Sequence, residues 1–286
     1  MHMASLRYRV VDVHQHQCSG SRQTSVPDLD GTLGEFRYSF PRMIHMATFS
    51  QIAFERRGAI GYLTLQRPQK RNAQTLEMWQ ELRQLGQQLQ AEPGELAVVV
   101  VAGAGGCFSS GVDTTLLTSG ALLTGSIDGK AIQEAFSWLR AGQFISIASI
   151  EKCAIGAGLE LALWCDMRLA AEGTIFSLPE VEFGIIPDLG GCSLLAEVCG
   201  YGRAMELITT ARRFGAVEAL QLGIVNEVVA VDQLPRRVEE LVGLLSKRSL
   251  TALRGAKRAT LAAIPDPASS LAVSLEVITD CFRQMP

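Results

Sequence analysis

The feature that most constrains the fold is a recurring order of buried strand, glycine-rich loop and helix. An apolar run over Ala97–Val101 predicts a buried strand, and residues 103–111 form a loop rich in glycine and serine. A second strand predicted over Phe144–Ile150 leads into a glycine turn at residues 156–158, followed by an apolar helix to Cys165. This alternation indicates an α/β fold.

Further segments extend this pattern in both directions. Alternating apolar residues predict two strands around the turn at residues 56–58. Helical spacing predicts helices over 75–90 and 130–140, and then over 234–245, 250–263 and 269–282. Because only helices are predicted beyond Val229, we divide the chain into an N-terminal extension (1–45), an α/β core (46–230) and a C-terminal helical region (231–286).

Composition narrows the partners and the compartment. The net charge of −3 does not favour binding to nucleic acid or to an acidic membrane surface. The longest apolar stretch, around residues 96–101, is far shorter than the ~20 residues of a membrane span. Seven cysteines without CxxC spacing indicate reduced thiols and a cytoplasmic location. We expect Cys153, Cys165 and Cys192 to pack as small buried hydrophobic residues.

The distribution of histidine excludes several mechanisms. All four histidines lie within the first 45 residues, at positions 2, 14, 16 and 45. The main body therefore cannot build a Ser–His–Asp site or a histidine-rich zinc site, and acid–base chemistry there must use other side chains. The His14-Gln-His16 segment is similar to a metal-binding strand, but such a site needs further histidines downstream. We predict no metal ion and no separate cofactor.

The two glycine loops also invite a nucleotide-binding interpretation. The loop after Val101 resembles the turn of a dinucleotide fold, but Phe108 occupies the place of the third glycine and no helix pattern follows directly. The segment at residues 156–161 likewise lacks the last small residue. A better use for both loops is to present backbone N–H groups to a developing oxyanion.

Four blocks of sequence stand out between Phe49 and Leu261: residues 66–73 (QRPQKRNA), 99–113 (VVVAGAGGCFSSGVD), 154–168 (AIGAGLELALWCDMR) and 176–191 (FSLPEVEFGIIPDLGG). In their order and spacing they resemble the enoyl-CoA hydratase/isomerase (crotonase) superfamily. The resemblance implies a spiral of ββα turns with a C-terminal helical trimerisation region. It also implies binding of acyl-CoA thioesters and stabilisation of a thioester enolate, and a homotrimer or a dimer of trimers.

The resemblance also implies roles for individual residues. The backbone N–H groups of Val112 and Ala157 would form the oxyanion hole, so the side chains at these positions matter little. The segment from Arg71 to Ala73 resembles the stretch that lines the adenine end of CoA. Glu160 and Glu180 occupy the positions of the two acid/base glutamates of the hydratases.

Two glutamates at these positions fit the chemistry of hydration. Adding water to an α,β-unsaturated thioester requires one group that takes a proton from water and one that delivers a proton to the α-carbon. We expect mutual repulsion to raise the pKa of one carboxyl and to leave the other ionised. The alternative is that Glu160 and Glu180 are solvated surface acids, but Glu160 lies in an apolar run where an unpaired charge would be costly.

Other charged residues near these blocks have open or structural interpretations. Asp188 is either a third acid on the substrate side, as in dienoyl-CoA isomerases, or a turn residue after Pro187. Asp113, next to the oxyanion loop, is expected to be a loop or cap residue on the substrate-binding side. We expect Asp166 and Arg168 to form a structural pair. Glu151-Lys152 replaces a common Asn-Gly of the family, which affects the geometry of the second loop.

The sequence therefore predicts an enoyl-CoA hydratase. Within the same family, the alternative is a double-bond isomerase that acts on an enoyl- or dienoyl-CoA. From a different class, the alternative is a non-catalytic acyl-CoA binder, which would have no need of two acids at a thioester site. Acyl chain length is not determined by any single residue.

Overall fold

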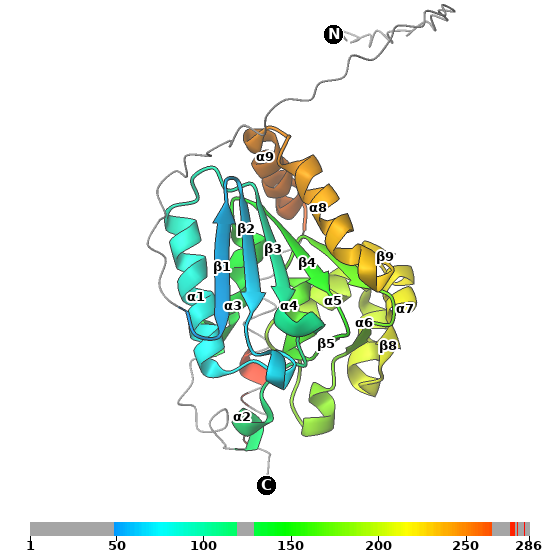
Figure 1. The fold of residues 1–286 in the computed structure, drawn as a ribbon. Coiled ribbons are helices and arrows are strands. Elements are labelled where there is room, and N and C mark those ends of the chain that lie inside the picture. Colours follow the sequence, from blue (N-terminus) through cyan, green and yellow to red (C-terminus); the bar gives the residue numbers. More distant parts are fainter. Residues whose placement is uncertain (1–48, 119–128, 265–274, 278, 280–282, 284–286) are drawn as a thin grey trace, which may run out of the picture. The chain divides into compact units, whose positions relative to one another are not determined.

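Two β-sheets form the centre of the computed structural model, which describes residues 49–118, 129–264, 275–277, 279 and 283 (Figure 1). The larger sheet has the order β1-β2-β3-β4-β6-β9 and the smaller one the order β5-β7-β8. The strands are β1 (Ile52–Arg57), β2 (Ile60–Leu65), β3 (Val98–Gly103), β4 (Ile145–Ile150), β5 (Cys153–Ile155), β6 (Met167–Ala171), β7 (Ile175–Ser177), β8 (Phe214–Gly215) and β9 (Glu227–Val229).

The larger sheet is antiparallel only at its β1–β2 hairpin. From β2 to β9, each strand runs parallel to its neighbour. The predicted strands of this hairpin, β3 and β4 are confirmed within a residue or two, and so is the α/β class. The sequence analysis missed β5, β6, β7, β8 and β9. Four of these strands have two or three residues, too short to show an alternating pattern, and β6 has only five.

The helices alternate with the strands along the chain. The α-helices are α1 (Leu76–Ala91), α2 (Thr114–Thr118), α3 (Gly129–Ala141), α4 (Ala157–Leu163), α5 (Gly191–Cys199), α6 (Tyr201–Thr210), α7 (Ala216–Gln221), α8 (Leu234–Leu245) and α9 (Leu250–Ala262). Short 3-10 turns are η1 (Pro68–Lys70), η2 (Ala104–Gly106), η3 (Glu180–Phe183) and η4 (Val231–Gln233). The helices predicted over 75–90, 130–140, 234–245 and 250–263 are confirmed as α1, α3, α8 and α9.

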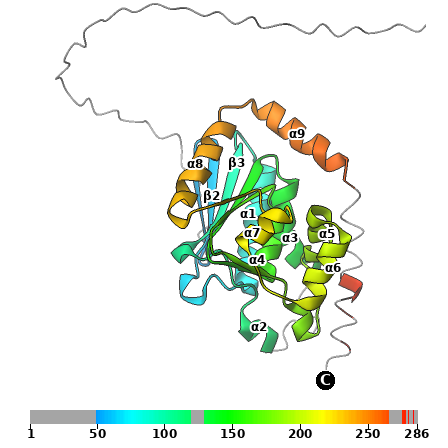
Figure 2. The same cartoon turned by 90° about the vertical axis from the view of Figure 1, so that its right-hand side faces the viewer.

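The large sheet is covered on both faces, as a parallel sheet requires. Figure 2 shows α8 along one face, with α1 and α3 on the other. Val98 and Val100 of β3 belong to a core that includes Val238 and Val242 of α8. Val99 and Val101 point the opposite way and are also fully buried. The core of the sheet is thus apolar on both sides, and polar side chains gather at its loops.

Helices α1 and α3 pack closely at a glycine, which has no side chain to keep them apart. A Cβ added at Gly86 of α1 would lie 2.3 Å from the ring of Trp138 of α3. The N-terminus of α1 is capped by Thr75, whose hydroxyl accepts a hydrogen bond from the N–H of Met78 at 3.2 Å. This cap fixes where the 66–75 segment ends and α1 begins. The segment contributes to the candidate functional site described below.

Some predictions concern residues outside those that the structure describes. The N-terminal extension (1–45) and most of the helix predicted over 269–282 belong to this group. The described residues from Phe49 onwards belong to one compact unit, and α8 is part of its main core. Among the described helices, none is long and apolar enough to cross a membrane.

Candidate functional site

The first part of the site is the N-terminus of α4. Gly156 precedes this helix with φ 52° and ψ −127°, a backbone conformation that favours glycine. The next residue, Ala157, is 1% exposed, and its N–H donates no hydrogen bond to any described residue. A free N–H at the start of a helix attracts negative charge.

The second part is the loop that ends at Val112. Gly111 has φ 93°, and a Cβ added there would lie 2.6 Å from the carbonyl oxygen of Ile155 and 3.7 Å from the nitrogen of Ala157. This loop therefore lies directly against the turn before α4. The N–H of Val112, like that of Ala157, donates no hydrogen bond within the described part of the chain. The structure thus places the two predicted oxyanion-hole segments side by side.

A buried glutamine joins these two segments, and the sequence analysis missed it. The backbone of Gln74 donates to the oxygen of Gly111 at 2.7 Å and accepts from the N–H of Asp113 at 2.8 Å. Its side-chain amide donates to the oxygen of Ala157 at 3.1 Å and to the hydroxyl of Ser109 at 3.2 Å. The indole N–H of Trp79 donates to its side-chain oxygen at 2.7 Å. A glutamine just before a capped helix reads as an exposed residue in sequence, so only its fully buried position identifies it.

Glu160 lies on the first turn of α4 and is held rigidly. Its side chain is 2% exposed, and its Oε1 accepts hydrogen bonds from the N–H groups of Leu189 and Gly191, both at 2.9 Å. Gly191 is required for this contact, because a Cβ there would lie 2.8 Å from the same oxygen. The Pro187–Gly191 segment, predicted as part of a family block, therefore shapes the environment of Glu160.

Glu180 begins η3 and lies against the turn before α4. A Cβ added at Gly156 would be 2.7 Å from its Oε1, so this carboxyl group sits beside the amide of Ala157. Its Oε2 is buried without a hydrogen-bond partner among the described residues. A buried carboxyl oxygen without a partner is costly unless the group is protonated or meets a ligand.

Burial changes the acidity of both glutamates. Desolvation raises the pKa of Glu180 to about 8, and the nearby charge of Asp188 adds to the rise. Desolvation also raises the pKa of Glu160, with repulsion from Glu180 and Asp188 adding to it and the two backbone donors opposing it. The expectation that mutual repulsion would raise one pKa and leave the other ionised is therefore wrong about the main cause. Loss of hydration comes first, because both groups lie in a largely apolar interior.

Asp188 is the third acid of this cluster. Burial raises its pKa to about 6, and its charge contributes to the raised pKa values of both glutamates. Its backbone oxygen accepts a hydrogen bond from the side chain of Gln133 at 2.8 Å, which anchors the turn to α3. Cys192 is close enough for all three acids to raise the pKa of its thiol. Both interpretations of Asp188, turn residue and third acid, are compatible with this position.

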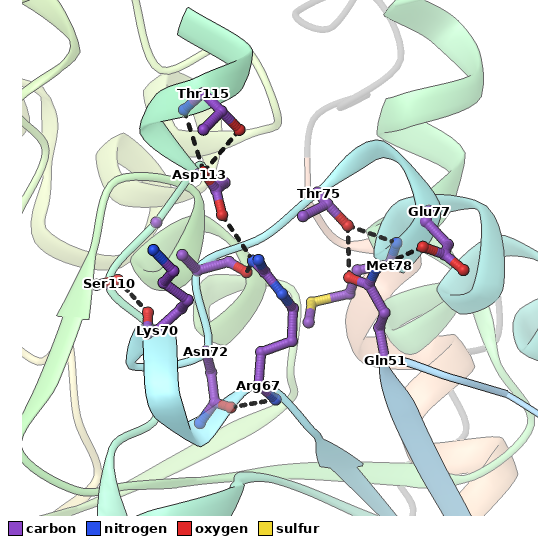
Figure 3. Close-up of polar contacts among 12 residues, drawn as sticks. Gln51, Arg67, Lys70, Asn72, Thr75, Glu77, Met78, Ser110, Asp113 and Thr115 are labelled. Carbon is purple, nitrogen blue, oxygen red and sulfur yellow. Dashed lines mark hydrogen bonds and ion pairs between the residues drawn. The ribbon is translucent and has the colours of Figure 1, made fainter.

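Polar side chains around Arg67 and Asp113 form a network beside the Val112 loop (Figure 3). Arg67 pairs with Asp113 at 2.9 Å, and Asp113 also accepts hydrogen bonds from the backbone N–H and hydroxyl of Thr115. Asp113 is therefore a loop and cap residue, as predicted. Asn72 is buried and binds the carbonyl oxygens of Ala104 and Cys107, so the 71–73 segment is fixed to the loop after β3.

Within that segment, the two predicted CoA-binding residues have different exposure. Arg71 is exposed and adopts a left-handed backbone conformation with φ 50°. Ala73 is buried at 9% exposure. The carbonyl oxygen of Arg71 accepts a hydrogen bond from the N–H of Ser110 at 3.0 Å, which again joins this segment to the glycine and serine loop.

The predicted pair of Asp166 and Arg168 is replaced by other contacts. Asp166 forms its ion pair with Lys257 of α9 at 2.8 Å. Arg168 donates instead to the carbonyl oxygens of Ile224, at 2.6 Å, and Cys165, at 2.6 Å. Asp166 lies just before β6 and Arg168 lies within it. Lys257 comes from α9 and Ile224 from a loop distant in sequence, and sequence spacing does not reveal such contacts.

The substitution of Asn-Gly by Glu151-Lys152 is accommodated by the backbone. Lys152 adopts φ 58°, and the turn closes with a hydrogen bond from the N–H of Cys153 to the oxygen of Glu151 at 2.7 Å. The left-handed position is thus retained by a lysine. The second loop still reaches the start of α4.

Among the described residues, no group of three or more His, Cys, Asp or Glu is arranged to hold a metal ion. The His14–His16 segment lies outside the described residues. The polar groups that converge on the start of α4 are the two free amides and three carboxyl groups.

Comparison with known proteins shows which sequences and structures resemble this chain. The family model described as enoyl-CoA hydratase/isomerase matches residues 55–283. The "Probable enoyl-CoA hydratase echA8" of Mycobacterium leprae is 32% identical over 200 residues, covering 70% of this chain and 77% of that protein. The peroxisomal Delta(3,5)-Delta(2,4)-dienoyl-CoA isomerase of Arabidopsis thaliana is 32% identical over 218 residues, covering 71% and 77%.

Solved structures show the same fold. A protein of Thermobifida fusca YX, assigned to the enoyl-CoA hydratases and crystallised in complex with acetoacetyl-CoA, superposes with a TM-score of 0.71. It is 35% identical, and the match covers 79% of this chain and 92% of that one. The crotonase-type fold predicted from the four sequence blocks is thereby confirmed, while the roles of individual residues stay predictions.

Proposed function

The chain belongs to the enoyl-CoA hydratase/isomerase family, and from that premise we propose that it adds water across the 2,3 double bond of a 2-enoyl-CoA thioester. The observation that carries the proposal is the meeting of two buried glutamates with two free backbone amides at the start of α4. An acyl-CoA substrate is supported by the acetoacetyl-CoA bound to the T. fusca relative. No other cofactor takes part in the proposed reaction.

In this mechanism the N–H groups of Val112 and Ala157 bind the thioester oxygen. Negative charge grows on that oxygen when water adds to the β-carbon and an enolate forms. Preorganised donors stabilise this charge more than they stabilise the neutral carbonyl, so they lower the barrier. The N-terminal end of α4 adds a favourable partial positive charge at the same place.

The contacts of the two glutamates suggest a division of roles. The two backbone N–H donors of Glu160 stabilise its charged form, which suits a base that takes a proton from water. Glu180 has an unpartnered oxygen and a pKa raised to about 8, so at neutral pH it holds a proton that it can deliver to the α-carbon. The two groups then exchange protonation states in each turnover.

The remaining predicted residues serve binding and support. Arg71 and Ala73 are proposed to contact the adenine end of CoA, and Arg71 is exposed enough to meet a phosphate. Asp113 acts through the loop: its pairing with Arg67 and Thr115 holds the peptide of Val112 in place. Asp188 lies on the substrate side of the acid cluster.

An isomerase is the second candidate, because Asp188 provides a third acid, partly buried, whose charge raises the pKa of both glutamates. The similarity to the A. thaliana dienoyl-CoA isomerase supports the same alternative. An isomerase moves a proton along the acyl chain, for which one carboxylate can suffice. In that case Asp188 would be an essential group, and one of the two glutamates would not.

Absorbance of the conjugated enoyl thioester tests these candidates directly. Loss of that absorbance from crotonyl-CoA indicates hydration, and its appearance from a 3-enoyl-CoA indicates isomerisation. Binding of acyl-CoA without any change would support a non-catalytic binder and contradict the proposal. A dienoyl-CoA substrate completes the comparison.

The proposed assembly is a homotrimer or a dimer of trimers. It rests on the family resemblance and on exposed apolar residues of the described helices, among them Tyr201, Met205 and Leu244. Apolar side chains exposed on several helices favour burial between subunits. Light scattering at micromolar concentration is expected to give a trimer or a hexamer, and a monomer would contradict this assignment.

A further inference from the structure

Two cysteines from distant segments meet beside the candidate site. Cys107 follows η2, and Cys153 opens β5, 46 residues later. Their Sγ atoms lie 2.9 Å apart, and both thiols are free. Cys107 is buried at 5% exposure, whereas Cys153 is partly exposed. The expectation that Cys153 is only a packing residue therefore overlooked its partner.

The backbone holds the two cysteines together independently of their side chains. The N–H of Phe108 donates to the oxygen of Glu151 at 2.9 Å, and the N–H of Ser109 donates to the oxygen of Cys153 at 3.0 Å. The N–H of Ile155 completes the connection by donating to Ser109 at 3.1 Å. Hydrogen bonds on both sides of the pair prevent the segments from separating when a thiol reacts.

The surroundings also favour reaction at one of the two sulfur atoms. The contact with Cys153 lowers the pKa of Cys107 to about 7, and the positive charges of Arg71 and Lys152 contribute. The same contact is the main cause that raises the pKa of Cys153, and burial raises that pKa further. The proton between the two thiols therefore stays on Cys153. A thiolate beside a protonated thiol is the arrangement of an attacking and a resolving cysteine.

We propose that Cys107 and Cys153 form a reversible disulfide when the protein meets a hydroperoxide. The Cys107 thiolate attacks one peroxide oxygen and becomes a sulfenic acid, and the other oxygen leaves as hydroxide and is protonated to water. The sulfur of Cys153 then attacks the sulfenic sulfur, and the departing hydroxide takes up the proton of Cys153. Overall, two thiols and one hydrogen peroxide give one disulfide and two waters.

The bond would link the two loops that carry the candidate oxyanion hole. Val112 lies five residues after Cys107, and Ala157 lies four residues after Cys153. A disulfide needs about 2.05 Å between its sulfur atoms, so the two sulfur atoms must come closer than the 2.9 Å of the reduced protein, and the bond then ties both loops together. The expected effect on turnover rests on the proposed function: oxidation lowers kcat more than it changes KM, and a thiol reductant restores kcat.

The test uses the full-length protein treated with hydrogen peroxide. Free thiols are then alkylated, and a digest is analysed by mass spectrometry with and without dithiothreitol. The expected result is a cross-linked peptide pair that contains Cys107 and Cys153 and disappears on reduction. The digest separates this pair from any cross-link made by the other five cysteines of the chain.

Three variants complete the test: two remove one thiol of the pair, and the third is a control. Cys107→Ser and Cys153→Ser are expected to abolish the cross-link and the loss of turnover on oxidation. Cys199→Ser is the matched control: Cys199 is also buried, but its thiol donates to the backbone oxygens of Leu195 and Gly200 rather than facing another thiol. That variant is expected to form the cross-link as the unmodified protein does.

The proposal is overturned if both thiols stay free under peroxide, or if Cys107 proceeds to a sulfinic acid without a cross-link. Because these outcomes are read from the unmodified protein, they do not depend on the folding of any variant. A cross-linked protein without enoyl-CoA turnover in either redox state would refute the proposed function and leave the disulfide in place. A cross-link that leaves kcat unchanged would refute the coupling to the site.

Discussion

The α4 region and the η3 region each present a buried glutamate to the same site, but they hold it differently. In the α4 region, Glu160 accepts two backbone hydrogen bonds from the 189–191 segment. In the η3 region, Glu180 has one oxygen against Gly156 and the other without a partner among the described residues. Both side chains are at least nine-tenths buried.

This difference shows how one interior can make two carboxyl groups unequal. Burial raises the pKa of each, because water that would stabilise the charge is lost. Two backbone donors from the 189–191 segment return part of that stabilisation to Glu160. Glu180 is stabilised by a hydrogen bond from its own backbone, and its Oε2 has no partner among the described residues. One carboxyl is therefore fixed as an acceptor, and the other is left free to exchange a proton.

Removing either carboxyl is the change with the largest expected effect. Glu160→Gln and Glu180→Gln are nearly isosteric, and each is expected to lower hydratase kcat by ~10²–10⁴-fold with acyl-CoA binding retained. Because both groups act in one process, the double variant is expected to be little worse than the poorer single one. Steady-state kinetics with crotonyl-CoA measures all three.

Glu182→Gln is the matched control for this pair. Glu182 lies on the same turn as Glu180 but is exposed, so its loss is expected to leave kcat unchanged. Near-normal turnover in both Glu160→Gln and Glu180→Gln would show that the site lies elsewhere. If instead only one of them matters and Asp188→Asn is severe, the isomerase alternative is favoured.

The turn before α4, which lies against Glu180, is the next most sensitive position. Gly156→Ala adds a Cβ 2.7 Å from Glu180 Oε1 at a residue with φ 52°, so strain and overlap act together. We expect a loss of about 2–4 kcal/mol in the free energy of unfolding, measured by denaturant titration. Gly173→Ala is matched in φ (76°) but meets no atom within 4 Å, and is expected to cost about 1 kcal/mol. Equal losses would mean that contact with Glu180 is unimportant.

A smaller effect is expected from Gln74, which supports the α4 side of the comparison. Gln74→Met keeps the volume but cannot bind Ala157, Ser109 or Trp79. The orientation of the Val112 and Ala157 N–H groups is then less well fixed. We expect kcat to fall about tenfold with little change in KM. A variant that loses thermal stability but keeps full kcat would show that Gln74 is only structural.

The last expected effect is on the pH dependence of stability. Glu180 has a pKa raised from 4.5 to about 8 in the folded protein, so between these values the folded state holds a proton that the unfolded state releases. Its contribution to the free energy of unfolding is complete below pH 4.5 and is lost as pH rises towards 8. Glu180→Gln removes this loss, so its Tm is expected to exceed that of the unmodified protein at pH 9 and to match it near pH 5.

Thermal unfolding of Glu182→Gln in the same two buffers provides the reference, since Glu182 is exposed on the same turn. The same small difference from the unmodified protein is expected at both pH values. A Glu180→Gln variant with no gain in Tm at pH 9 would contradict the raised pKa.

Local patterns in the sequence were sufficient for much of the fold. The helical spacing of Met78, Leu82, Leu85 and Leu89 identified α1, and all four side chains are buried. The valines of β3 and the glycine loops that follow the strands identified the α/β class. The positions of Glu160 and Glu180 came from matching blocks, since nothing in composition marks two glutamates as members of one site.

Contacts between distant segments were decided only by the tertiary structure. The partners of Asp166 and Arg168, the meeting of Cys107 with Cys153 and the bridging role of Gln74 join residues from different elements. The order of pKa causes is of the same kind, because desolvation depends on how completely neighbouring chain segments exclude water. Periodicity records which way a side chain points along its own helix or strand, whereas packing decides what it meets there.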